Sequence, residues 1–139
     1  MATKIREIMT GSPTSVSPEL DLVTVARAMR DEDIGTVLVA DGDDLVGLVT
    51  DRDLVIRGLA MGGDPTQLNI GGIASSATAT VGPDDSLDKA AQIMRERAVR
   101  RLPVIEDGRP VGIVSLGDLA MERDEVSALA DISVARPNT

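Results

Sequence analysis

The sequence predicts an α/β fold of the α+β type, made of two similar halves that pack about a pseudo-two-fold axis. The first observation is an internal repeat: displaced by 65 positions without a gap, the chain aligns with itself from Val16 and Val81 to Leu54 and Leu119. The second is that each copy runs through a short β-prone stretch, a helical pattern, two apolar runs joined by a tight turn, and another helix. Two copies are too few for a solenoid, so each half should cover the apolar face of the other.

A short strand and an amphipathic helix open each copy. β-prone runs at 14–16 and 78–81 each end before a turn that contains proline. Asp21 and Ser86 then stand where a helix N-cap is expected. The apolar residues at helical spacing are Leu22, Val25, Ala26 and Met29 in the first copy and Leu87, Ala90, Ala91, Ile93 and Met94 in the second. We expect these stripes to face the core or a subunit interface.

A hairpin and a second helix complete each copy. The predicted hairpins join Val37–Ala40 to Leu45–Val49 and Leu102–Ile105 to Val111–Val114. Gly and Asp tolerate the positive φ of tight turns, so we interpret Asp41-Gly42-Asp43-Asp44 as a turn rather than a calcium loop, which needs more oxygen donors. The closing helices are predicted at about 51–59 and 116–123.

Chain order divides the molecule into four segments. We place the first half with its N-terminal segment at 1–62, a linker at 63–69, the second half at 70–123 and a tail without periodicity at 124–139. Ahead of the two first strands, the offset pairs two expected helical turns, with Ile5, Ile8 and Met9 in one and Ile70, Ile73 and Ala74 in the other. We expect both turns to have the same role ahead of the first strand of their halves, so the repeat starts earlier than its clearest matches.

The composition argues against several classes of function. The chain has no Cys and no His, which removes thiolate chemistry and the commonest general base and metal ligand, so we expect neither an enzyme nor a metal site. A net charge of −9 and the absence of Phe, Tyr and Trp argue against nucleic-acid binding. The N-terminal residues do not resemble a signal peptide, and no run of about 20 apolar residues could span a membrane. We therefore expect a soluble, cytoplasmic protein.

One nine-residue stretch occurs twice and carries the main functional signal. Val46-Gly47-Leu48-Val49-Thr50-Asp51-Arg52-Asp53-Leu54 is echoed by Val111-Gly112-Ile113-Val114-Ser115-Leu116-Gly117-Asp118-Leu119. In both, an apolar strand stops at a hydroxyl residue, and an aspartate follows three positions later. With a hairpin before each copy, and Val99-Arg100-Arg101-Leu102-Pro103-Val104 before the second, the chain resembles a CBS (cystathionine β-synthase) domain pair, or Bateman module, from about Ile5 to Met121.

The resemblance implies a β-α-β-β-α order in each half, two related clefts between the repeats and a homodimer formed through helices. It also implies an adenosine-containing ligand such as AMP, ADP or ATP, whose ribose the motif's aspartate holds while the Thr or Ser contacts the nucleotide near its phosphate. A carboxylate can accept from two vicinal hydroxyls, and a hydroxyl with free N–H groups at a helix start offers donors to an anion. Carried over by position, the ligand-binding residues are Thr50, Arg52 and Asp53 at one cleft and Arg100, Arg101, Ser115 and Asp118 at the other.

Two questions stay open at this point. Asp53 and Asp118 could instead stabilise the first turns of their helices, by about 0.3 to 1 kcal/mol, with the hydroxyl residues as N-caps. The complete motif favours the cleft of Asp53, whereas nearby arginines favour the other, because Arg100 resembles a position that often meets phosphate and its counterpart is Gly35. A stand-alone regulatory module that senses an adenosine ligand and acts on a protein partner is favoured. The alternative is a ligand-free dimeric interaction or stress-response protein.

Overall fold

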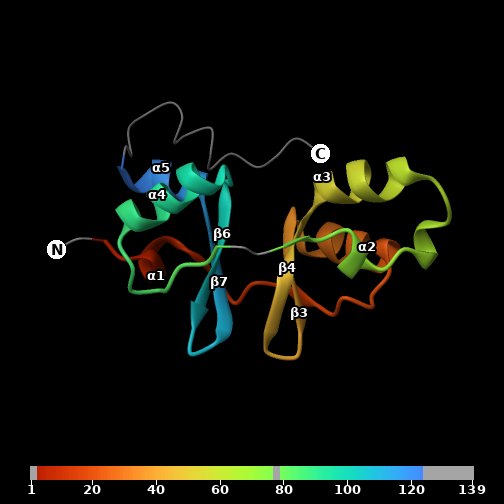
Figure 1. Cartoon of the computed structure of the whole chain (residues 1–139), viewed down its shortest axis with the longest axis horizontal. Coiled ribbons are helices and arrows are strands. Elements are labelled where there is room, and N and C mark those ends of the chain that lie inside the picture. The colour runs from red at the N-terminus through yellow and green to blue at the C-terminus, as the bar shows by residue number, and fades with distance from the viewer. Residues whose placement is uncertain (1–2, 77–78, 124–139) are drawn as a thin grey trace. The chain divides into compact units, whose positions relative to one another are not determined.

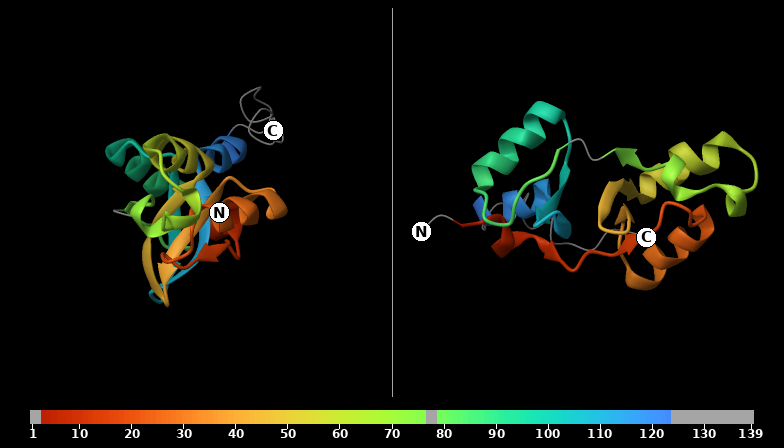
Figure 2. Two further views of the ribbon diagram at one scale, coloured as in Figure 1. Left: turned by 90° about the vertical axis from the view of Figure 1, so that its right-hand side faces the viewer. Right: turned by 60° about the horizontal axis from the view of Figure 1, so that its bottom comes forward.

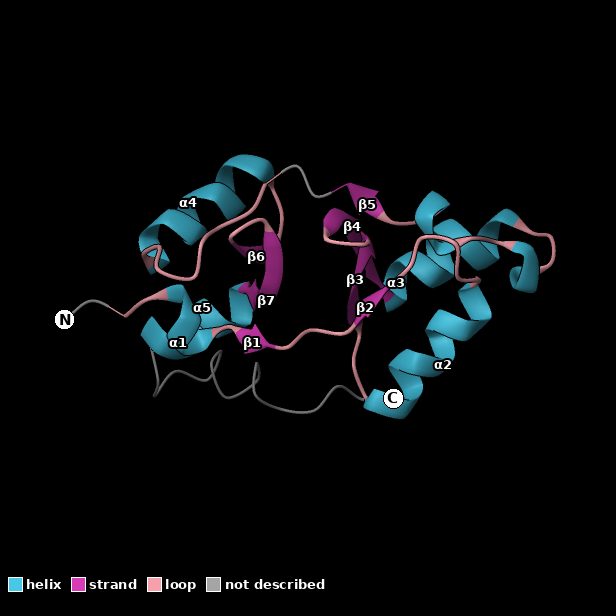
Figure 3. Ribbon diagram, turned by 90° about the horizontal axis from the view of Figure 1, so that it is seen from below, coloured by secondary structure: helices cyan, strands magenta, loops and turns pink. Residues whose placement is uncertain are grey.

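The computed structural model describes residues 3–76 and 79–123, which form two compact units (Figure 1). The first unit is built mainly from residues 13–76, and the second mainly from residues 3–12 together with 79–123. In each unit the helices lie on one side of the strands (Figure 3). The tail expected at 124–139 lies outside the described residues. In the described parts of the chain, no helix is both long enough and apolar enough to cross a membrane.

The first unit contains a four-stranded sheet in the order β2-β3-β4-β5. Its elements are β2 (Ser15–Val16), α2 (Leu22–Glu32), β3 (Thr36–Asp41), β4 (Asp44–Thr50), α3 (Asp51–Asp53), the π-helical η1 (Leu54–Gly58), the 3-10 turns η2 (Leu59–Met61), η3 (Pro65–Gln67) and η4 (Ile70–Gly72), and β5 (Ser75–Ser76). Strand β2 is parallel to β3, and the other neighbours are antiparallel. The helix predicted at 51–59 is therefore present but changes from α to π to 3-10 along its length.

The second unit contains a three-stranded sheet in the order β1-β7-β6. Its elements are α1 (Ile5–Ile8), β1 (Thr10–Gly11), α4 (Leu87–Arg97), β6 (Arg101–Glu106), β7 (Arg109–Ser115) and α5 (Leu116–Arg123). Of the strand predicted at 78–81, residue 78 lies outside the described residues, and Val81 forms a single parallel bridge to Val104. Figure 2 shows α4 beside the hairpin of β6 and β7.

The helix caps and the hairpin turn predicted from local sequence patterns are present in the structure. The Asp21 carboxylate accepts the Thr24 N–H at 3.1 Å, and the Ser86 hydroxyl accepts the Lys89 N–H at 3.1 Å. Both residues therefore cap their helices as expected. The acidic run of the first hairpin is a turn, with Gly42 at φ 63°.

Each unit has its own aliphatic core. The buried residues are Val16, Leu22, Val25, Met29, Val37, Val39, Val49, Leu54, Ile70 and Ile73 in the first unit, and Ile5, Val81, Leu87, Ala90, Met94, Leu102, Val104, Val114 and Leu119 in the second. The helical stripes predicted from the sequence thus face the cores, with Met29 and Met94 inside. Methionine's flexible side chain suits a core that has no aromatic rings to fill it.

Each of the two helical turns that precede the first strands packs on the other unit, and not on the one that follows it in the chain. We call residues 4–11 the N-terminal strap and residues 69–76 the middle strap. Ile5 is fully buried in the core of the second unit and Ile70 in the core of the first. The Ile5 N–H donates to the Asp85 carbonyl at 3.1 Å, and the Ile70 N–H donates to the Leu20 carbonyl at 2.8 Å. Chain order groups each strap with the half that follows it, whereas packing groups it with the other half, whose sheet edge it covers.

Candidate functional site

Each central hairpin ends in a strand-to-helix junction that is closed by two reciprocal hydrogen bonds. In the first junction, Thr50–Asp53, the Asp53 N–H donates to Thr50 Oγ1 at 3.2 Å and the Thr50 N–H donates to Asp53 Oδ2 at 2.9 Å. In the second junction, Ser115–Asp118, the corresponding distances are 3.1 Å and 2.8 Å. The repeated hydroxyl and aspartate thus form a capping box in both units, with Asp in the place where Glu is common.

The capping box leaves one carboxylate oxygen of each aspartate available. Oδ2 accepts the backbone bond, and Oδ1 of Asp53 and of Asp118 has no hydrogen bond in the described residues. Because those residues contain no buried side-chain polar atom without a partner, each Oδ1 must reach solvent. A carboxylate held in this way can still accept from a ligand hydroxyl. The cap and the ligand-binding role are therefore compatible, and the cap fixes the carboxylate in one orientation.

A backbone hydrogen bond places one further residue beside each junction. The Asp51 N–H donates to the Gly35 carbonyl at 3.0 Å, and the Leu116 N–H donates to the Arg100 carbonyl at 2.8 Å. The two bonds are related by the offset of the repeat. Gly35 and Arg100 therefore occupy the same place in their units, immediately before the central hairpin.

The side chains at these paired positions differ in charge. A Cβ at Gly35 would lie 3.1 Å from Asp51 Oδ2, and the Arg52 N–H donates to Asp51 Oδ1 at 2.8 Å. The Asp51 carboxylate thus lies over Gly35, with Arg52 next to it. In the second unit the paired residues are Arg100 and the half-exposed Leu116. The sequence marked Gly35 as a departure from the pattern but not the carboxylate that lies over it.

The predicted arginines lie near the junctions without contacting their aspartates. Arg52, Arg100 and Arg101 are exposed. In the described parts of the chain, their side chains form no hydrogen bond or ion pair with Asp53 or Asp118. Their placement near the junctions comes from the backbone. Their proposed contact with a ligand stays a prediction.

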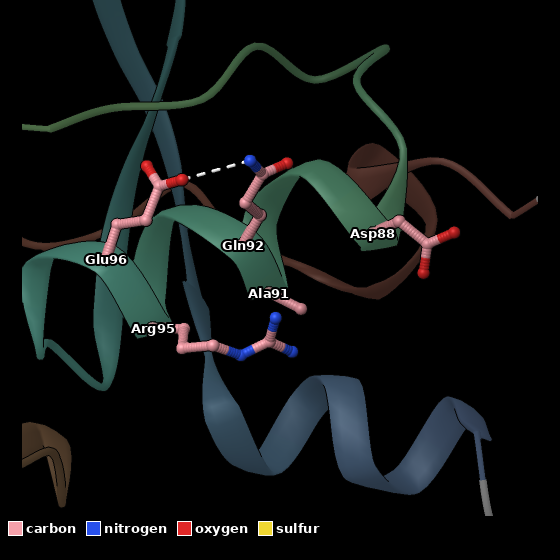
Figure 4. Close-up of a pocket in the computed structure, with 5 residues that line it drawn as sticks. All are labelled: Asp88, Ala91, Gln92, Arg95 and Glu96. Atoms are coloured by element: carbon pink, nitrogen blue, oxygen red, sulfur yellow. Dashed lines mark hydrogen bonds between the residues drawn. The ribbon is translucent and has the colours of Figure 1, made fainter.

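A surface hollow of about 390 Å³ lies along α4 (Figure 4). It is lined by Asp88, Ala91, Gln92, Arg95 and Glu96. The Gln92 amide donates to the Glu96 carboxylate at 3.0 Å across the helix surface. This hollow shares no residue with either junction, and the described residues contain no group of three or more acidic side chains placed to hold a metal ion. The candidate site therefore consists of the two junctions.

The comparisons with known proteins agree on one family. The model of the CBS domain matches residues 5–59 and 70–125. Hypoxic response protein 1 of Mycobacterium tuberculosis is 40% identical over 124 residues, which span 88% of this chain and 87% of that protein.

Solved structures agree in fold. The crystal structure of Hypoxic Response Protein I with two coordinated zinc ions has a TM-score of 0.75 and 40% identity, and it covers 85% of this chain and 97% of its own. A hexameric CBS-CP12 protein from bloom-forming cyanobacteria has a TM-score of 0.80 and 25% identity, covering 91% and 71%. The CBS domain pair of protein MJ0100, in complex with 5′-methylthioadenosine and S-adenosyl-L-methionine, has a TM-score of 0.78 and 22% identity, covering 91% and 100%. At that identity the last comparison shows the shared fold alone.

Proposed function

Because this chain belongs to the CBS domain family and carries two such domains in tandem, we propose that it is a regulatory module that binds an adenosine-containing ligand at its two junctions. The observation that carries the proposal is the fixed carboxylate of Asp53 and Asp118, each with Oδ1 open to solvent. An oriented carboxylate accepts from the vicinal hydroxyls of a ribose at little cost in side-chain entropy. The complex of the MJ0100 domain pair supports the idea that such a fold accommodates adenosine compounds.

The remaining groups of each junction have roles that follow from their chemistry. The Thr50 and Ser115 hydroxyl oxygens accept the capping bond, and their O–H groups can still donate to a ligand near the ribose. Arg100 and Arg101 supply positive charge in the second unit and Arg52 in the first. We propose no catalytic step, since the relatives compared above are named as response or CBS-domain proteins. The zinc of the hypoxic response protein is not carried over, because this sequence has neither His nor Cys.

We further propose that the module is a homodimer in the cytoplasm and passes a ligand-dependent change to a protein partner. The helical run of η1 and η2 exposes Val55, Ile56, Leu59 and Met61, at 52%, 51%, 52% and 77% of their surface. Four exposed apolar residues on one short run favour contact with another protein surface. The hexameric CBS-CP12 protein supports assembly as a property of related chains.

Calorimetric titration tests ligand binding. AMP, ADP, ATP, S-adenosyl-L-methionine and NAD are titrated into the wild type and into the double variant Asp53→Asn, Asp118→Asn. Asparagine keeps an oxygen for the capping bond but replaces the open oxygen with an amide donor, so the fold is preserved while the acceptor is lost. We expect at least one ligand to bind and the double variant to weaken it by about tenfold or more, as a lost charge-assisted hydrogen bond implies. No heat with any ligand at millimolar concentration would refute the proposal.

The second candidate is a ligand-free interaction or stress-response protein, as the name of the hypoxic response protein suggests. It is favoured by the capping boxes, which give Asp53 and Asp118 a structural role without any ligand. Mass spectrometry of small molecules released from the denatured, purified protein separates the two candidates. A co-purified nucleotide would eliminate the ligand-free function.

A further inference from the structure

The two junctions differ by an exchange of charge at one pair of positions. In the first junction Gly35 stands beside Asp51, whose carboxylate lies over it; in the second, Arg100 stands beside Leu116. The same backbone bond joins the pair in both units, so each substitution occupies an equivalent place. At one position the first unit has the negative Asp51 where the second has the neutral Leu116. At the other, the first unit has the neutral Gly35 where the second has the positive Arg100.

The Asp51 carboxylate is oriented rather than free. Its Oδ1 accepts the Arg52 N–H at 2.8 Å, and its Oδ2 lies 3.1 Å from the place where a Cβ of Gly35 would be. Any larger residue at position 35 would meet this carboxylate. The glycine therefore leaves room for the Asp51 carboxylate, whereas the second unit has Arg100 at this position.

We propose that Asp51 is a specificity-determining residue that rejects phosphorylated ligands from the first junction. The first junction then takes an uncharged adenosine compound, such as a nucleoside or its thioether, and the second takes a nucleoside phosphate. This inference rests on the proposed function. It assigns different chemical classes of ligand to the two junctions.

The charges around the junctions support this division. Positions 35, 36 and 50–53 of the first unit hold two aspartates and one arginine, whereas positions 100, 101 and 115–118 of the second hold two arginines and one aspartate. The first set is net negative and the second net positive. A phosphate near the Thr50 hydroxyl would lie next to the Asp51 carboxylate, and like charges at such short range oppose binding. An adenosine without phosphate escapes that repulsion and keeps its contact with Asp53.

The test compares AMP with 5′-methylthioadenosine, which shares the adenosine but carries no phosphate. Both ligands are titrated calorimetrically into full-length protein whose second junction is weakened by Asp118→Asn. Adding Asp51→Asn removes the charge and keeps an oxygen for the Arg52 N–H. We expect AMP to bind about tenfold more tightly, while the affinity for 5′-methylthioadenosine changes less than twofold. The gain should shrink as salt is raised, because exposed charges are screened.

A matched exchange tests the second junction. Gly35→Arg with Asp51→Leu gives the first junction the residues of the second, and Arg100→Gly with Leu116→Asp does the reverse. The three atoms nearest to a Cβ at position 35 all belong to the Asp51 carboxylate, which Asp51→Leu removes, and the second unit already holds Arg100 and Leu116 at the same pair of positions. AMP affinity should rise in the first variant and fall in the second, with circular dichroism confirming the fold of both.

The outcomes separate this inference from the proposed function. If neither of these two ligands nor ADP, ATP, S-adenosyl-L-methionine or NAD binds the wild type, the proposed function fails and the inference fails with it. If both ligands bind and Asp53→Asn weakens them, but the ratio of their affinities is unchanged by Asp51→Asn and by both exchanges, only the division of ligand classes is overturned.

Discussion

The two units share their backbone register but diverge after the junction. Strand β1 pairs with β7 through Thr10 and Ile113, and β5 pairs with β4 through Ser75 and Leu48, which are the same positions under the offset. Beyond the two capping boxes, the second unit continues as the α-helix α5, whereas the first passes into a π-turn and a 3-10 turn. The repeated motif thus determines where the helix begins but not which type of helical turn follows.

Gly58 lies where the first unit diverges from the second. It ends η1, and a Cβ there would clash with the Leu22 side chain and lie 3.2 Å from Ile73 Cδ1. The absent side chain lets η1 approach α2 and η4 closely. A π-turn adds a residue to one turn of helix and shifts the following side chains around the axis. The changed winding of residues 54–61 thus coincides with close packing against two neighbouring segments.

The straps differ in charge although they share their backbone contacts. In the N-terminal strap, Arg6 pairs with Asp84 and Glu106, each at 2.9 Å. The offset places Gly71 at the corresponding position of the middle strap, so that strap has no such cation. Both straps are nevertheless docked in the same register. Apolar burial and backbone hydrogen bonds, rather than ion pairs, are thus common to both docking sites.

The largest expected effect comes from removing the buried isoleucine of either strap. Ile5→Ala and Ile70→Ala should each lower the free energy of unfolding by about 2 to 5 kcal/mol, because both side chains are fully buried. Urea unfolding followed by far-UV circular dichroism measures this. Leu20→Ala is the control: its side chain is exposed and lies outside the apolar run of η1 and η2, so its replacement should cost much less. A cost below about 1 kcal/mol for either strap variant would show that its strap is not docked as described.

Alanine at the paired glycines under the straps should cost less and should distinguish the two. A Cβ at Gly47 would clash with the backbone carbonyl of Ser75, whereas at Gly112 it would meet Met9 Sδ at 2.5 Å and the Thr10 carbonyl at 2.9 Å. Overpacking of this kind costs about 1 to 3 kcal/mol. Gly47→Ala should be the worse variant, because a thioether moves more easily than a backbone carbonyl. Gly11→Ala, which has nothing within 4 Å, serves as the neutral control in the same urea titrations.

Removing the junction hydroxyls should have a smaller and nearly equal effect. Thr50→Ala and Ser115→Ala each lose the acceptor for one orphan N–H, at a cost of about 1 kcal/mol. Thr50→Ser and Ser115→Thr keep the acceptor and should restore stability. The exchange rates of the Asp53 and Asp118 backbone amides measure the protection at each junction separately. Unequal changes in protection would show that the two capping boxes are not equivalent.

The smallest effect concerns acid sensitivity. The Arg6 guanidinium bond lowers the pKa of Asp84, and the Gly82 N–H lowers the pKa of Asp85. A carboxyl group whose pKa is lower in the folded state adds stability above its unfolded pKa, and this stability is lost as the pH falls through the folded pKa, below about 4. Arg6→Gly, which copies the middle strap, should reduce the acid-induced fall in melting temperature between pH 5 and pH 2.5.

Salt and a matched variant complete that test. Because Arg6 and Asp84 are exposed, high salt should reduce the difference between the wild type and Arg6→Gly. Asp84→Asn removes the same titrating pair and should produce a similar, shallower pH dependence. An unchanged acid profile in both variants would exclude the Arg6–Asp84 pair as a source of acid sensitivity.

Local patterns were sufficient to predict most elements and the junction residues. The helical spacing after Asp21 and Ser86, the glycine turns and the hydroxyl-to-aspartate spacing each depend on hydrogen bonds within a few residues. They therefore form in the same way wherever the segment packs. The same spacing predicted that Thr50 lies beside Asp53 and Ser115 beside Asp118. It does not determine whether a ligand binds there.

Tertiary structure alone decided three features: which unit each strap covers, how η1 winds, and what lies over Gly35. The straps carry the same apolar pattern, so Ile5 and Ile70 fit both docking sites in sequence terms, and chain order does not show which unit each one covers. Gly58 reads as an ordinary glycine in the sequence and Gly35 as a departure from the repeat, but the sequence does not show that Leu22 lies against the first and the Asp51 carboxylate against the second. Each of these features depends on residues distant in sequence that meet only after folding, which a periodic pattern does not encode.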